Sequence, residues 1–226
     1  MRAQLWNLLC VIILLAAATE AQAQAGTTTI MRTRGTGGVL RATAAPNTCV
    51  QNTLEVRALE SAQRVQPGGS NTERREVFIN YFVTDRCTRL SLAFQIEASA
   101  AAQLSVRRQL DRGELSLDAA SINVRRCQAR GTAVVCQLVQ LPVKLQVTWR
   151  YNGLYDLHVG TSSSRDNQGF RVDAINEVRH VADVTYRFEL EGSVISFDKV
   201  EGSLISTTEG QFSLTRPTEV PLTVLP

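Results

Sequence analysis

This chain of 226 residues has little of what most catalytic and nucleic-acid-binding sites require. Its only histidines are His158 and His180, and aromatic residues make up 6% of the chain. It has no G-x-S-x-G serine motif and no H-E-x-x-H zinc motif, and its net charge of +3 is no basic excess. The sequence therefore predicts no catalytic residue, no metal ligand, no cofactor and no nucleic-acid partner.

Long apolar runs are also scarce, and the one that exists lies at the N-terminus. The run from Leu8 to Ala18 follows a basic Arg2 and precedes small residues with A-x-A spacing. It is about half the length needed to cross a bilayer core, which is roughly 20 residues. This layout predicts a signal peptide over residues 1–25, cleaved after Ala23 or Ala25. We therefore expect a secreted or periplasmic protein with no membrane span after cleavage.

Lysine is nearly absent, so almost all the positive charge is carried by arginine, which binds carboxylates and phosphates in a bidentate manner. Three arginine pairs stand out, at residues 74–75, 107–108 and 125–126. Adjacent residues of a strand face opposite sides of a sheet, so the two members of a pair cannot build one patch. The pairs are expected to occupy exposed strand positions, and an anionic-polymer site made of clustered arginines is the alternative.

Helical periodicity is missing, and the dominant pattern is the alternation of apolar and polar residues. It is clearest over residues 90–98, 143–151 and 184–190. Residues 54–65 fit either a strand or a short helix. About ten strands with one polar face predict an all-β fold, an antiparallel β-sandwich of Ig-like or jelly-roll-like type. A single sheet closed on itself is the second architecture.

Three stretches are poor in large apolar residues. Residues 26–47 are predicted to be a flexible arm, ordered only if they pair on a sheet edge, and residues 48–226 a single domain. Residues 66–75 are predicted to be a turn or long loop. In the tail, Glu-Gly pairs at residues 191, 201 and 209 indicate turns between short strands.

Four cysteines remain after cleavage, which favours two disulfides in an oxidising compartment. Residues 127–136 are symmetric about Gly131 and Thr132, and a two-residue turn there pairs Cys127 with Cys136. That position has a Cα separation of about 4.5 Å, within disulfide range. Cys49 and Cys87 then pair by elimination. Zinc is disfavoured because no C-x2-C spacing occurs.

A second hairpin is predicted around Tyr151-Asn152-Gly153, with a three-residue loop that pairs Trp149 with Tyr155 and buries the tryptophan.

Together these features predict an exported, disulfide-stabilised interaction or structural protein of the periplasm or cell surface, with a protein or glycan of the cell envelope as partner. The candidate binding residues lie in two polar stretches and are Asp156, His158, Arg165, Asp166 and Asn167. A hydrolase acting on envelope or extracellular polymer through carboxylates is the main alternative.

Overall fold

The structure is a computed structural model that describes residues 27–69, 71–165 and 169–215. For residues 27–28, 155–165, 169–173, 175 and 213–215 it describes the backbone alone. None of the described residues forms a helix, and so the described chain holds no helix suited to spanning a membrane.

Ten β-strands account for most of the described residues. They are β1 (Thr27–Ala44), β2 (Val50–Gln66), β3 (Asn71–Asp85), β4 (Leu90–Glu97), β5 (Gln103–Val106), β6 (Arg112–Arg130), β7 (Ala133–Arg165), β8 (Gly169–Leu190), β9 (Ser193–Ile195) and β10 (Lys199–Thr215). Every pairing between them is antiparallel. The prediction of an all-β antiparallel fold is confirmed.

The strands form one sheet that closes on itself. Its order is β10-β1-β2-β3-β4-β6-β7-β8-β9, and β10 also pairs with β8, so that eight strands form a ring. The short strands β5 and β9 pair outside this ring, with β6 and β8 respectively. The predicted sandwich of two sheets is not confirmed, because the pairings join all ten strands in one sheet.

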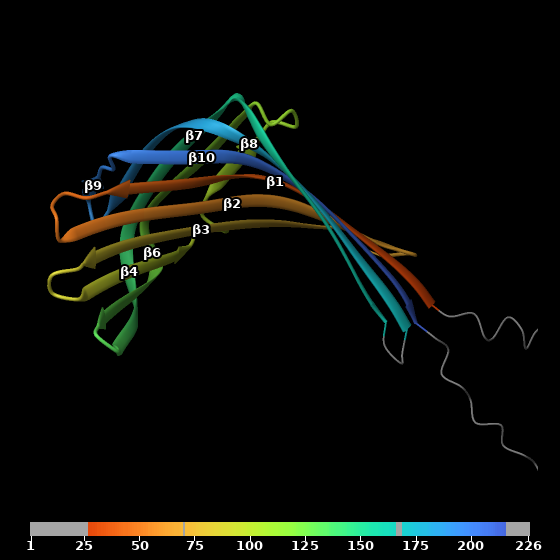
Figure 1. The fold of residues 1–226 in the computed structure, drawn as a ribbon, viewed down its shortest axis with the longest axis horizontal. Helices are drawn as coiled ribbons and strands as arrows, with labels where there is room; N and C mark the ends of the chain where they lie inside the picture. The colour runs from red at the N-terminus through yellow and green to blue at the C-terminus, as the bar shows by residue number, and fades with distance from the viewer. Residues whose placement is uncertain (1–26, 70, 166–168, 216–226) are drawn as a thin grey trace, which may run out of the picture.

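Several strands are much longer than the ring requires, and they project from it. Figure 1 shows β1, β7, β8 and β10 sweeping away together from the rounded part of the molecule, with the ends of β2 and β3 beside them. We call the closed part the body. We call the projecting strand ends the arm, which comprises residues 27–36, 59–66, 71–76, 155–165, 169–180 and 206–215.

Trp149 on β7 is at the centre of the body. Its side chain is fully buried, and its indole Nε1 donates a hydrogen bond of 2.9 Å to the carbonyl of Val39. The ring packs directly on the backbone of β1, because a Cβ at Gly38 would lie 2.7 Å from it. A Cβ at Gly202 of β10 would clash with Val184 and would lie 3.1 Å from the indole. Gly38 therefore makes room for the largest side chain of the core, and Gly202 makes room chiefly for Val184.

The sequence predicts a flexible segment over residues 26–47, whereas most of these residues form a strand. From Thr27 to Ala44 they form β1, which pairs with β10 on one side and with β2 on the other. Three of the glycines that indicated a loose segment are close-packed instead, since Gly38 contacts Trp149, Gly37 contacts the backbone of β2 and Gly35 contacts Thr207. The Glu-Gly pairs of the tail are reinterpreted in the same way, since only Gly192 lies in a turn, whereas Gly202 and Gly210 lie inside β10.

The structure decides between the alternatives at two places, and it overturns a third prediction. Residues 54–65 belong to a strand, β2, and residues 66–75 hold a turn after which β3 begins at Asn71. The hairpin expected at Tyr151 is absent, because β7 continues past this point with only an irregularity between Tyr151 and Tyr155. Trp149 therefore lies opposite Val184 of β8, although its predicted burial is correct.

Both disulfides are present in the predicted pairing. Cys127 and Cys136 join β6 to β7 across the turn at Gly131, with a Cα separation of 4.0 Å and the derived register. Cys49 and Cys87 join the segments that flank β2 and β3, with a Cα separation of 5.3 Å. Two intramolecular disulfides indicate that the chain folds in an oxidising environment outside the cytoplasm.

Candidate binding groove

The inner face of the sheet changes from apolar to charged where the body meets the arm. A row here is a set of four residues, one from each of β10, β1, β2 and β3, that lie opposite one another in the register. The change takes place between two such rows that are adjacent on the inner face. The last buried row is Leu204, Gly38, Ala58 and Val77, and the next two rows are Ser206, Thr36, Glu60 and Arg75, then Thr208, Arg34, Ala62 and Glu73. The same side of the same strands therefore supplies both the core and a polar surface.

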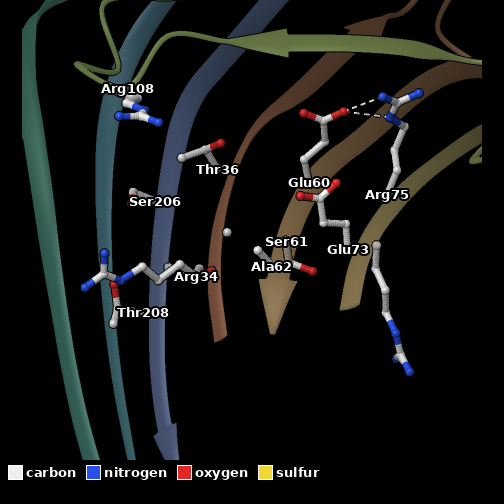
Figure 2. A pocket seen from close by; sticks show the side chains of 13 residues that line it. Arg34, Thr36, Glu60, Ser61, Ala62, Glu73, Arg75, Arg108, Ser206 and Thr208 are labelled. Carbon is white, nitrogen blue, oxygen red and sulfur yellow. Dashed lines mark hydrogen bonds and ion pairs between the residues drawn. The ribbon is translucent and has the colours of Figure 1, made fainter. Parts of the chain in front are cut away.

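These polar rows line a groove of about 880 Å³, which also takes in Arg108 from the segment between β5 and β6. Figure 2 shows hydroxyl-bearing side chains, Thr36, Ser206 and Thr208, over β1 and β10. The guanidinium groups of Arg34 and Arg108 lie on that side of the groove, whereas the glutamates lie over β2 and β3. The groove is thus divided into a basic side and an acidic side.

Arg75 is held firmly on the acidic side. Its guanidinium contacts Glu60 through Nε at 2.7 Å and Nη2 at 2.5 Å. Its third nitrogen, Nη1, donates to the carbonyl of Ala102 at 3.0 Å. Because each of its three nitrogens already has a partner, Arg75 orients Glu60 at the edge of the groove and contributes little free charge.

Arg108 is brought to the groove by a turn that is anchored in the core. Leu110, two residues further on, is buried, and its amide donates to the carbonyl of Arg107 at 2.9 Å. Arg107 also forms an ion pair of 3.3 Å with Asp111 inside the turn. These contacts leave Arg108 at the tip, exposed and facing the groove.

Arg34, Arg108 and Glu73 form no ion pair with any residue that the structure describes. Two unpaired guanidinium groups provide bidentate donors for carboxylate, sulfate or phosphate groups. The Glu73 carboxylate can accept hydrogen bonds, and the hydroxyl side chains can both accept and donate them. The groove is therefore equipped for a ligand that carries both anionic groups and hydroxyls.

Two of the arginine pairs of the sequence contribute to this groove, the first through Arg74 and Arg75 and the second through Arg108. Alternation places Arg75 on the inner face of β3 and Arg74 on the opposite face, as expected for neighbours on a strand. Arginines that are distant in the sequence nevertheless line the same groove, with Arg34 and Arg108 on one side of it and Arg75 on the other. Only strand order reveals this convergence. Arg126 lies elsewhere, 5.6 Å from the ring centre of Phe94.

The candidate residues selected from the sequence do not line this groove. Asp156, His158 and Arg165 lie on β7, with Asp156 paired to Arg179 and His158 paired to Glu177 in the backbone register. Asp166 and Asn167 lie outside the described residues. The prediction that these residues bind a partner is untested.

One group of potential metal ligands occurs among the described residues, namely Cys49, Asp85 and Cys87. The two sulfur atoms are bonded to each other as a disulfide, so they are not available as thiolate ligands.

A comparison with models of protein families finds no match for this chain, and a search of curated proteins finds none either.

Proposed function

We propose that this chain is an exported interaction protein of the periplasm or cell surface, and that its groove binds an acidic glycan. The observation that carries the proposal is the arrangement of Arg34 and Arg108, two unpaired guanidinium groups above a floor of hydroxyl side chains. Carboxylate or sulfate groups of the glycan bind to the arginines. Its hydroxyls bind to Ser206, Thr208 and Glu73.

The groove has the size and position for a polymer. Its volume of about 880 Å³ lies in the upper part of the range that ligand sites occupy, about 300 to 1,000 Å³. A second hollow continues along the arm and is lined by Arg32, Arg64 and Asn71 among others. A chain that leaves the groove therefore meets further arginines along the same face.

Binding is tested with three immobilised polymers, namely dextran sulfate, polygalacturonate and uncharged dextran. The protein is expected to bind the anionic polymers and not dextran, with an affinity that falls as salt is added, because charge pairs at the surface are screened. Replacing both Arg34 and Arg108 by Ser is expected to weaken binding about tenfold or more.

The matched control replaces Arg57 and Arg150 by Ser. Both are exposed, and both lie outside the groove, so this variant loses the same charge. Equal losses in the two variants, or equal binding to dextran, would contradict a specific site in the groove.

Hydrolysis of the polymer is the second candidate function. Glu60 and Glu73 lie on adjacent strands of the same face, and paired carboxylates are the usual catalysts of glycoside hydrolysis. Glu60 is ion-paired with Arg75, which favours a positioning role for it. Release of reducing ends from polygalacturonate, abolished by Glu73→Gln, would replace the binding proposal by this one.

Export is supported by two observations. The protein has two disulfides, and β1 begins at Thr27, so cleavage after Ala23 or Ala25 removes no described strand. The N-terminal sequence of the protein recovered from outside the cytoplasm is expected to begin at Gln24 or Gly26. An intact Met1 in that fraction would contradict a cleaved signal.

A further inference from the structure

The first part of β7 is an open sheet edge. Residues 133–141 pair with β6 on one side, and pairing with β8 begins only at Val143. No described strand lies on the other side of residues 133–141. The backbone groups that point to that side are therefore available to another strand.

This edge lacks the features that prevent sheets from associating. The nine residues from Ala133 to Leu141 include no charged side chain and no proline. Val134, Val135 and Leu138 are 63%, 71% and 69% exposed, among the most exposed large apolar residues described. The open edge of β3 is different, because residues 73–76 are all charged. Natural proteins protect open edges with such charges, and this part of β7 has none.

The direction of the backbone groups follows from the turn at Gly131. In a two-residue hairpin the pair next to the turn, Arg130 and Ala133, is hydrogen-bonded, and the pattern then alternates. The N–H and C=O groups of every second residue therefore point away from β6. The residues concerned are Val134, Cys136, Leu138 and Gln140.

We propose that this edge pairs with the same edge of a second copy of the chain, antiparallel about a twofold axis at Gln137. This register places Val134 opposite Gln140 of the copy, and Cys136 opposite Leu138 of the copy. Each of these pairs exchanges two backbone hydrogen bonds, because all four residues direct their groups outward. The edge is thus complementary to itself, as an interface with twofold symmetry requires.

The side chains and the lack of charge favour a second copy as the occupant. In this register Val135 meets Val139 of the copy on one face of the joined sheet. On the other face, Leu138 covers the Cys127–Cys136 disulfide of the copy. An uncharged edge brings no like charges together when it meets itself. The inference is independent of the glycan proposal, because none of residues 133–141 lines the groove.

Disulfide trapping tests the register. In the proposed dimer the two Gln137 residues face each other as a non-hydrogen-bonded pair, with Cα atoms about 4.5 Å apart, within disulfide range. The variant Gln137→Cys is expected to form a covalent dimer on a non-reducing gel. The matched control is Gln140→Cys on the same strand, which lies opposite Val134 of the copy and is expected to form none. Equal cross-linking in both variants would overturn the register.

The mass of the exported protein in solution tests the association itself. Sedimentation over a range of concentrations is expected to show a monomer and dimer in equilibrium. Leu138→Lys is expected to weaken the dimer about tenfold or more, because it brings two charges to the shared edge. Leu154→Lys is the control, since Leu154 is 63% exposed and lies away from this edge. A protein that is monomeric at every concentration, or equally affected by both substitutions, would overturn the proposal.

Discussion

The body and the arm are built from the same strands but have opposite surfaces on the same side of the sheet. In the body, the inner face of β2 presents Leu54, Val56 and Ala58, all of which are buried. In the arm, the same face of the same strand continues with Glu60 and Arg64. Pairing between β1, β2 and β3 continues through both regions without interruption.

Backbone pairing therefore does not define the boundary between the two regions. The ring closes where inward side chains are apolar and exclude water, and it gives way to an open sheet where they are charged. The boundary lies between two adjacent rows, with Val77 on one side and Arg75 on the other. A groove forms there because a polar surface begins directly at the mouth of a closed core.

The largest expected effect is that of Trp149→Ala, which removes the centre of the body. The side chain is fully buried, and such truncations cost about 3 to 5 kcal/mol of the free energy of unfolding. Arg34→Ala in the arm is expected to change that free energy by less than about 0.5 kcal/mol. Urea denaturation of both variants measures the contrast. Similar losses would show that the body and the arm are equally important for stability.

Loss of a disulfide is expected to have the second-largest effect on the free energy of unfolding. Replacing Cys49 and Cys87 by Ala opens a loop with a sequence separation of 38, whereas the Cys127–Cys136 loop has a separation of 9. The chain-entropy model predicts losses of about 4 and about 3 kcal/mol respectively. Denaturation curves of the two double variants give this order, and the reverse order would indicate that strain outweighs loop entropy.

A smaller effect is expected for the ion pair of the groove. Glu60→Gln breaks its contact with Arg75, but both side chains are partly exposed, at 38% and 40%. Exposed pairs contribute about 0 to 1 kcal/mol, so the melting temperature is expected to change little. Binding to dextran sulfate is the more sensitive measurement, because Arg75 becomes free to bind the polymer and the affinity is expected to rise.

The smallest effect is limited to alkaline pH and concerns Tyr81 in the body. Burial raises the pKa of this phenol above its ordinary value, which is about 10. A raised pKa gives a stabilising contribution that is present below pH 10 and is lost as the pH rises through the folded-state pKa. Tyr81→Phe is therefore expected to lose less stability than the original protein between about pH 10 and 12. Equal losses in that range would indicate that the ionisation of Tyr81 is unimportant.

The sequence predicts the parts of the fold that rest on local patterns. The register of the hairpin between Cys127 and Cys136 follows from its turn, and the alternation at residues 90–98 identifies β4. The groove escapes prediction because Arg34, Glu73 and Arg108 meet only through the pairing of distant strands. Gly38 escapes it for a related reason, since it is explained by Trp149, which is far away in the chain.

The pairing of β1 with β10 has a consequence for the time at which the fold is completed. These strands are the first and the last that the structure describes, and their register joins Thr27 to Thr215. During synthesis, which starts at the N-terminus, the chain can form the β2–β3 and β6–β7 hairpins early, because their contacts are local. The seam between β1 and β10 closes only after nearly the whole chain has emerged, so Trp149 loses its last contact with water at the end of folding.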